Sequence, residues 1–533
     1  MIRQQLAASL RSHLAALGVE VDEVHLEQPA RREHGDWSTN VVMANAKRLG
    51  RNPRELAAEL VAALATDPPA HVERVEIAGP GFVNFHLAPT WLHDVLRVVV
   101  EAGPDRYARS ELGAGRRVLV EFVSANPTGP LHAGHARGAT YGDALARVLE
   151  RVGYEVDREF YINDRGTQMA KMGASIEARA HGQHPPEDGY HGEYITEWAA
   201  DFPLDADPTE HGYAKALEDQ REVLGHLGIV FDHWFSEREM VESGAIDTTL
   251  ADLRAHGAVY EADGAVWLRS TDLGDDKDRV LVKSDGEFTY LLPDIAYHRD
   301  KYERGYELLI DVWGADHHGY IPRMKAALQF LGHGAEQFEV AITQMVRLMR
   351  GDEEVKLSKR TGDLIELRDI VTEVGPDATR LVYLQQSVDS PQTVDLAAIT
   401  EQSMDNPVFY VQMAHARLCS IGRVATERGV ERRPLADVDL TPLVHDRELE
   451  VLRALNNLPA VVEVAARDRA PHKVAHWCRD LAGAVHGWYH DCPVLRDDVD
   501  DATRQARLWL AEAALVGLRV GLGVLGASAP ESM

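Results

Sequence analysis

Two histidines, His132 and His135, stand three residues apart in the stretch NPTGPLHAGHARG, residues 126–138. The stretch follows the apolar run VLVEFV and precedes a segment of helical period, so a strand, a tight turn and a helix are expected in that order. A helix start offers unpaired N–H groups and a partial positive charge, which suit a phosphate. The spacing puts both imidazoles on one side of the turn, and Gly134 leaves room for a base or ribose. Alternatively, the histidines only cap or pack the helix start.

Two lysines, Lys356 and Lys359, stand in the stretch EVKLSKRTGD, residues 354–363. With Arg360 they place cations where they could neutralise charge on a departing pyrophosphate. Alone, this stretch could be a solvated basic loop; together with HAGH in one βα domain it is a far more specific signal. The sequence contains no GxxxxGK[ST] or HExxH motif, which excludes the P-loop and the zincin helix.

The elements that must position these residues follow from the apolar pattern. RVLVEFV and EVDREFYI predict strands, GATYGDALARVLERVG between them predicts a helix, and YELLIDVWGADHHG predicts a further strand. A strand, a helix and a strand within about 45 residues predict a parallel pair with a right-handed crossover, and hence a doubly wound, Rossmann-like α/β fold. Such folds bind ligands at the carboxyl ends of their strands, where the HAGH turn stands.

Three domains are expected along the chain. Residues 1–110 mix helical and alternating segments and predict an α+β N-terminal domain. Residues 111–385 form the parallel-sheet domain, with an acidic insertion at about residues 175–285. Residues 386–533 are helical in period and predict an all-α helical bundle.

The composition is that of a globular protein without a membrane segment. The chain has 533 residues and a net charge of −29, which argues against a nucleic-acid partner unless the charge is local. Residues 181–310 hold 29 Asp and Glu against 11 Lys and Arg, so basic surfaces remain possible elsewhere. There is no signal peptide or long apolar run, and the three cysteines form no CxxC pair, so we expect a cytoplasmic protein without a cysteine-rich zinc site.

HAGH and KLSKR resemble the His-Ile-Gly-His and Lys-Met-Ser-Lys-Ser signatures of class I aminoacyl-tRNA synthetases, with Ala133, Leu357 and Arg360 as departures. More narrowly, the chain resembles arginyl-tRNA synthetases over nearly its whole length. The matching segments include GDWSTNVVMANAK, GPGFVNFHL, VEFVSANPTGPLHAGHARG, YINDRGTQM, YLLPDIAYH, GADHHGYIPRMKAAL, VKLSKRTGDLIELRDIVTEVGPDATR, DNPVFYVQMAHARLCSI and the terminal LGASAPESM.

The resemblance implies ATP-dependent activation of L-arginine and its transfer to the 2′-hydroxyl of the terminal adenosine of tRNA(Arg), with Mg²⁺ accompanying the pyrophosphate. It implies that bound tRNA is needed for activation and that the enzyme is not itself acylated. Such chemistry is positioning and charge stabilisation, so no nucleophile triad is required. We expect a monomer without a membrane partner.

The resemblance also implies roles for individual residues. His132, Gly134 and His135 would bind ATP, Lys356 and Lys359 would stabilise its triphosphate, and Asp316 and His317 in GADHHGY would border the adenosine and arginine pockets. A metal at Asp316, His317 and His318 is disfavoured, because adjacent histidines diverge and no fourth ligand is evident.

For the amino acid, the resemblance implies that Glu121, Tyr290 and Asp294 face the guanidinium, which pairs well with carboxylates. Asn126 would face the α-carboxylate or amine. Alternatively, Glu121 only ends a strand and Asp294 only caps a helix. Pro293 stands where the family often has a basic residue.

For the tRNA, the resemblance implies that Phe82 and Asn84 lie near the D-loop and that Arg417, Tyr489 and Met533 contact the anticodon loop by stacking and phosphate pairing. A core position in a strand is the alternative for Phe82. Met413 stands where the family has a stacking residue.

Two other functions were weighed. The first is another class I synthetase or a HxGH nucleotidyltransferase; small nucleotidyltransferases lack a helical C-terminal domain, and cysteinyl or methionyl types carry cysteine-rich zinc elements. The second is a catalytically silent tRNA-binding relative, which is expected to have lost HAGH or the loop lysines. Both of those motifs are intact here.

Overall fold

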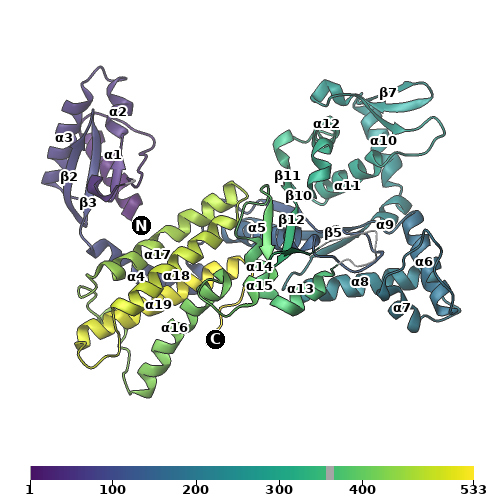
Figure 1. Ribbon diagram of the computed structural model, residues 1–533. Coiled ribbons are helices and arrows are strands. Elements are labelled where there is room, and N and C mark those ends of the chain that lie inside the picture. Colours follow the sequence, from purple (N-terminus) through teal and green to yellow (C-terminus); the bar gives the residue numbers. More distant parts are fainter. Residues whose placement is uncertain (1, 30, 356–364) are drawn as a thin grey trace. The chain divides into compact units, whose positions relative to one another are not determined.

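The computed structural model describes residues 2–29, 31–355 and 365–533 and divides into two compact units (Figure 1). The terminal unit comprises Met1–Tyr107, Arg417–Asn457 and Gly483–Gly517. The sheet unit comprises Ala108–Ala416, Leu458–Ala482 and Leu518–Met533.

The N-terminal part of the terminal unit is α+β, as the sequence predicts. Its helices are α1 (Ile2–Ala16), α2 (Val41–Ala46), α3 (Pro53–Thr66) and α4 (Thr90–Arg106). Its antiparallel sheet has the order β1-β3-β2, with β1 (Trp37–Thr39), β2 (Val72–Ala78) and β3 (Phe82–Leu87). Helix α1 buries Leu6, Leu10 and Leu14, which recur every four residues and so share one face.

The sheet unit is built on five parallel strands in the order β11-β10-β4-β5-β6. They are β4 (Arg117–Glu121), β5 (Glu155–Ile162), β6 (His233–Ser236), β10 (Leu308–Gly314) and β11 (Phe338–Thr343). The chain runs outward from β4 through β5 to β6 and then returns to β10 on the other side of β4. This reversal makes the carboxyl ends of β4 and β10 the switch point, where doubly wound folds bind ligands.

Both faces of the central strands are buried, which is typical of parallel sheets covered by helices. Val118, Leu119 and Val120 of β4 are each at most 1% exposed. Leu119 packs in a core with α11 (Leu291–Glu303) and α12 (Ile321–Phe330), while α5 (His135–Arg151) contacts β4, β5 and β10. Because side chains alternate along a strand, Glu121 shares the α11 side of the sheet with Leu119.

The long connection from β5 to β10 contains helices and a second small sheet. Its helices are α6 (Thr167–Ala180), α7 (Glu193–Ala200), α8 (Pro208–His226), α9 (Glu237–Glu242) and α10 (Ala245–Ala255). An antiparallel sheet of order β7-β8-β9 follows, from β7 (Val259–Ala262), β8 (Ala265–Leu268) and β9 (Arg279–Val282). Strand β6 belongs to the central sheet, so the stretch expected as an insertion at about residues 175–285 also supplies an edge strand.

The rest of the sheet unit follows β11. A sheet of order β13-β12-β14 contains β12 (Val346–Arg350), β13 (Glu353–Glu354) and β14 (Gln392–Asp395). Helices α13 (Leu367–Val374), α14 (Pro376–Tyr383) and α15 (Leu396–Thr400) accompany it.

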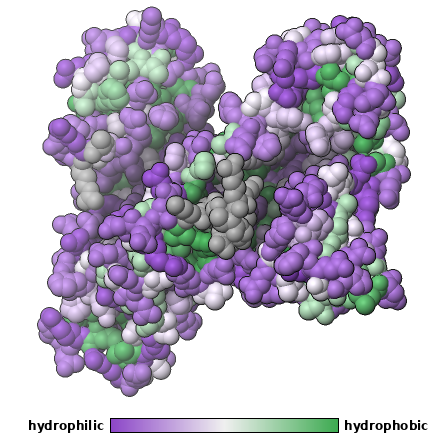
Figure 2. Space-filling view, turned by 45° about the vertical axis from the view of Figure 1, so that its right-hand side comes forward, coloured by the Kyte–Doolittle hydropathy of each residue, from purple (hydrophilic) through white to green (hydrophobic). Residues whose placement is uncertain are grey.

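The C-terminal segment is all-helical, as the sequence predicts, with α16 (Pro407–Glu427), α17 (Asp446–Arg467), α18 (His472–Asp491) and α19 (Asp501–Val524). The fold class predicted from the sequence is therefore confirmed. Among the described residues, no helix combines the length and apolarity that crossing a membrane would need. Hydrophilic side chains cover most of the face shown in Figure 2.

Candidate active site

The HAGH turn forms an open helix start. His135 is the first residue of α5, and Gly134 before it is exposed. The His132 and His135 rings lie side by side, with centroids 3.8 Å apart. A Cβ on Gly134 would lie 2.8 Å from Cε1 of His132, so the turn has room only for glycine while the ring keeps this position.

The hydrogen bonds of the turn indicate which ring nitrogen of each histidine carries the proton. Nδ1 of His132 accepts from the Gly134 N–H at 3.1 Å, and Nδ1 of His135 accepts from the His132 N–H at 3.1 Å. In a neutral imidazole, an accepting Nδ1 leaves the proton on Nε2. Each ring therefore presents an Nε2–H donor beside the positive end of α5, which suits a phosphate.

The HAGH turn is bonded to the segment that directly follows the KLSKR stretch. The N–H of Ala133 donates to the carbonyl of Ile365 at 3.0 Å, and the N–H of Leu367 donates to that of Leu131 at 2.7 Å. His132 and Glu366 form the bridge pair between them. Residues 365–367 are thus anchored to the HAGH turn, whereas Lys356 and Lys359 lie outside the described residues.

The loop between β4 and HAGH is strained. Val123 has φ 70° and Ser124 has φ 43°, in the left-handed region that non-glycine residues, and β-branched ones above all, avoid. This turn brings the Ser124 hydroxyl back to Oε1 of Glu121, at 2.8 Å. The strain therefore occurs where the loop leaves the carboxyl end of β4, at the residue whose hydroxyl holds the Glu121 carboxylate.

Helices of the connection between β5 and β10 donate hydrogen bonds to the loop between β4 and HAGH. Nε2 of Gln220 in α8 donates to the carbonyls of Asn126 and Gly129, at 3.2 and 3.1 Å. Tyr194 in α7 donates to the Thr128 carbonyl at 3.1 Å. Asn126 donates to Oε1 of Gln168 in α6 at 2.9 Å. Part of the acidic connection therefore supports the turn that carries the two histidines.

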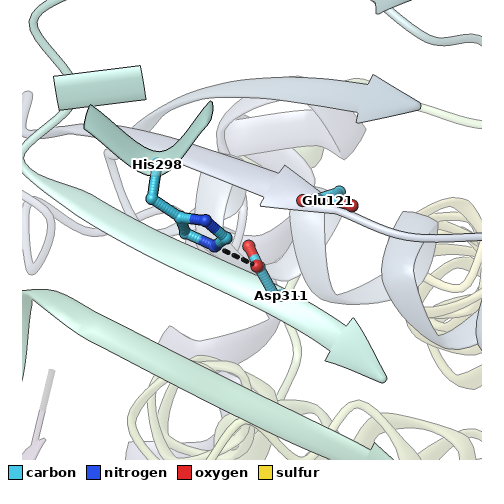
Figure 3. Close-up of side chains that lie close together, drawn as sticks. All are labelled: Glu121, His298 and Asp311. Carbon is cyan, nitrogen blue, oxygen red and sulfur yellow. Dashed lines mark hydrogen bonds and ion pairs between the residues drawn. The ribbon is translucent and has the colours of Figure 1, made fainter. Parts of the chain in front are cut away.

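A buried ionic cluster lies between the carboxyl end of β4 and the middle of β10 (Figure 3). Glu121 and Asp311 are register partners on these strands, so their carboxylates face the same side. Nζ of Lys301 in α11 donates to Oε2 of Glu121 at 2.6 Å and to Oδ1 of Asp311 at 2.9 Å. His298 binds Oδ2 of Asp311 at 2.8 Å.

The cluster sets the charges of its members. Burial raises the pKa of Glu121, with Lys301 acting in the opposite direction and Asp311 adding to the rise. Burial also opposes ionisation of Asp311, but Lys301 and His298 outweigh it and lower the pKa of Asp311 to about 2. A cation arriving beside Glu121 would favour its ionised form, so the site is suited to a positively charged ligand.

Asp294 forms a second acidic position beside this cluster. It lies in the first turn of α11, and the Tyr320 hydroxyl donates to its Oδ2 at 2.6 Å. Burial raises the pKa of Asp294, and the Tyr320 hydroxyl opposes that rise. Tyr290 precedes α11 and is 89% exposed. Asp316 and His317 are exposed in the short helix Ala315–Tyr320, directly after β10.

The grouping of Glu121, His298 and Asp311 has the ligand types of a metal site, since one ligand atom from each falls within 4.8 Å of the others. The ammonium of Lys301 bonds both carboxylates of this group. A cation of the protein itself therefore fills the role of counter-ion, and the cluster is a salt-bridge network.

Of the residues predicted for tRNA contact, Arg417 and Tyr489 lie close to each other. In the terminal unit, Arg417 contacts Nδ1 of His486 at 2.9 Å, and its guanidinium carbon lies 5.6 Å from the Tyr489 ring centroid. Phe82 is half-buried, and Asn84 is 4% exposed with Oδ1 accepting from Ser38 at 2.7 Å. Met533, at the end of the sheet unit, is 53% exposed.

Sequence reasoning missed several residues of this site, among them Lys301, Asp311 and Gln220. Asp311 had a usable signal, because a lone carboxylate inside the apolar strand LLIDVW must be paired when buried. Lys301 and Gln220 stand in helices rich in charged residues, where nothing in the pattern separates them from solvated neighbours.

Three family models match the chain. A model of the arginyl tRNA synthetase N-terminal domain matches residues 2–87, one of the class I (R) tRNA synthetase catalytic domain matches residues 101–187 and 219–420, and one of the DALR anticodon binding domain matches residues 411–533.

Individual relatives agree with these models. An arginine–tRNA ligase from Bacillus licheniformis is 44% identical, with 100% of this chain and 98% of that protein covered. One from Carboxydothermus hydrogenoformans is also 44% identical, with 100% and 99% covered. The structure of an arginyl-tRNA synthetase from Thermus thermophilus shares the fold, with a TM-score of 0.75, 23% identity and 100% of both chains covered.

Proposed function

The chain belongs to the arginyl-tRNA synthetases of class I, and we propose on this basis that it uses ATP to join L-arginine to tRNA(Arg). The observation that carries the proposal is the placement of an open helix start with two Nε2–H donors next to buried carboxylates at one switch point. The first element suits a triphosphate and the second suits a guanidinium.

In this proposal, arginine binds at the carboxyl ends of β4 and β10. Glu121 and Asp294 accept the guanidinium, whose fork of donors pairs with carboxylate oxygens. The exposed Tyr290, at the start of α11, borders the same subsite. Asn126 contacts the α-carboxylate or α-amine, and the bond to Gln168 holds its side chain.

ATP binds along the HAGH turn, with His132, Gly134 and His135 at its phosphates and Asp316 and His317 bordering its adenosine. An oxygen of the arginine carboxylate attacks the α-phosphorus, the bond to the β-phosphate bridging oxygen breaks, and pyrophosphate leaves. Lys356 and Lys359, in the stretch that leads to Ile365, neutralise the charge that develops on the pyrophosphate.

Mg²⁺ would accompany ATP in this proposal and would supply charge neutralisation on its phosphates. Glu366 would offer it a carboxylate, because its backbone pairs with that of His132 and Mg²⁺ prefers carboxylate and phosphate oxygens. The 2′-hydroxyl of the terminal adenosine then attacks the arginyl carbonyl carbon, and AMP leaves while the hydroxyl proton passes to solvent.

The tRNA contacts remain predictions. Arg417 and Tyr489 form a pair that can stack on a base and bind a phosphate, and Phe82, Asn84 and Met533 are the further expected contacts. The domain boundaries at residues 110 and 385, a monomeric state and a cytoplasmic location also remain predictions. Light scattering after gel filtration and cell fractionation test the last two.

The test of the function is charging of bulk tRNA with each of the twenty amino acids. We expect arginine alone to be charged efficiently, and we expect ATP–pyrophosphate exchange with arginine only when tRNA is added. Charging of any other amino acid in preference to arginine would overturn the proposed specificity.

A further inference from the structure

Lys301 is the fully buried cation of the ionic cluster. It is 0% exposed in α11 and bonds one oxygen each of Glu121 and Asp311. A buried ammonium is costly unless it is paired, and two carboxylates at matched positions on adjacent strands repel each other. Lys301 removes both penalties at once.

The partners of the two carboxylates differ. Asp311 takes the ammonium of Lys301 on Oδ1 and the imidazole of His298 on Oδ2. Glu121 takes Lys301 on Oε2 but only the neutral Ser124 hydroxyl on Oε1, and each carboxylate oxygen can accept more than one hydrogen bond. Asp311 thus has two basic partners, whereas Glu121 has one and can accept a cationic ligand as its second.

We propose that Lys301 is a positioning residue that keeps Glu121 ionised and aimed, so that the pocket selects a cationic amino acid over a neutral one of the same shape. The inference rests on the proposed function and deepens it. The neutral competitor it concerns is citrulline, in which a urea replaces the guanidinium.

The surroundings of Glu121 determine what losing Lys301 would do. The titratable groups on its side of the sheet are Lys301, His298 and Tyr297 from α11, Asp311 from β10, and Glu159 and Tyr161 from β5. Without Lys301, burial and the Asp311 charge both favour the protonated form of Glu121, and only His298 and the Ser124 hydroxyl remain to oppose them. A protonated Glu121 would accept a guanidinium poorly.

The experiment compares the full-length wild type with K301M, K301R and D311N by aminoacylation with tRNA(Arg) between pH 6 and 9. Loss of an opposite charge within about 4–6 Å raises a carboxyl pKa by about 1–3 units. We therefore expect K301M to raise the KM for arginine about 10- to 100-fold at pH 7, with recovery toward pH 9 and an unchanged KM for ATP. Discrimination against citrulline should fall in parallel. K301R should restore both the KM for arginine and the discrimination against citrulline.

D311N provides the opposing test, because it removes the charge that favours protonation of Glu121 while leaving Lys301. We expect its KM for arginine to be no more dependent on pH than that of the wild type. R304M is the matched control: Arg304 follows α11 directly and bonds Glu159 at 2.6 and 3.0 Å without contacting Glu121. Thermal unfolding reports whether each variant folds.

Two results would overturn the inference. One is a KM for arginine in K301M that does not change with pH. The other is equal damage by K301M, D311N and R304M at every pH, which is what a purely structural role predicts. If the wild type fails to charge arginine at all, the proposed function fails instead, before any variant is compared.

Discussion

Substitution of Gly134 by alanine tests the assigned role of the HAGH turn. The new Cβ would lie 2.8 Å from Cε1 and 2.9 Å from Nδ1 of His132. Gly134 has φ −64°, so alanine strains no backbone, and the conflict lies with the ring alone. The ring can yield only by losing the bond from the Gly134 N–H and its contact with the His135 ring.

The expected loss can be given a size. Forcing an extra methyl group into a packed site costs about 1–3 kcal/mol. If that cost falls on the phosphate-binding geometry, the KM for ATP rises about 5- to 150-fold, since about 1.4 kcal/mol corresponds to tenfold. The assay is aminoacylation at saturating arginine and tRNA with ATP varied, and tRNA binding should stay unchanged.

The matched control is G138A, four residues further along α5. A Cβ on Gly138 would meet only Thr343 Cγ2 at 3.9 Å and Val312 Cγ1 at 4.0 Å, which are ordinary contacts. We expect G138A to bind ATP as the wild type does. A KM for ATP within twofold of wild type in G134A, or the same rise in both variants, would refute the reasoning.

Three further predictions concern other parts of the molecule. Burial, with Asp369 and Asp219, raises the pKa of Glu366 from 4.5 to about 7. The stability that protonated Glu366 contributes is therefore complete below about pH 4.5 and is lost as pH rises through 7. The urea midpoint of the wild type should fall between pH 5 and 8 and that of E366Q should fall less, and equal pH dependence of the two midpoints would contradict this. Q220L leaves the carbonyls of Asn126 and Gly129 without their donor, so it should lower the free energy of unfolding by about 1–3 kcal/mol and raise the KM for arginine and ATP. An unchanged free energy of unfolding together with unchanged KM values would show that the loop does not need these hydrogen bonds. Y489A and R417A should each weaken tRNA binding by about 1–3 kcal/mol in fluorescence anisotropy while leaving the KM for ATP unchanged, and full-strength binding by both would exclude them from the interface.

The central strands could be predicted from the sequence because local pattern determines them. RVLVE and EVDREFYI form β4 and β5 as expected, since short apolar runs bounded by turn residues are typical of buried parallel strands. The short edge strand HWFS was not predicted as a strand and fell within the expected insertion, because four residues within an acidic stretch give little periodic signal. Strand order depends on contacts far apart in sequence, which no local pattern contains.

In the site, too, the residues of one local turn could be predicted from the sequence and those that meet from distant segments could not. His132, Gly134 and His135 follow one another closely, so their joint geometry follows from one turn and could be expected from spacing alone. Lys301 acquires its role only when Glu121 and Asp311 converge on it from two strands. The left-handed Val123 and Ser124 also had no signal, because neither residue type favours that conformation.

The strand order has a consequence for synthesis of the chain. Strand β4 pairs with β10 on one side, and residues 122–307 lie between the two strands. At about 5–20 residues per second, the ribosome delivers β10 about 10–40 s after β4. During that interval the inner edge of β4 has unpaired N–H and C=O groups, which can recruit another chain. Chaperone dependence of newly made protein should therefore be greatest for nascent chains that end between β6 and β10.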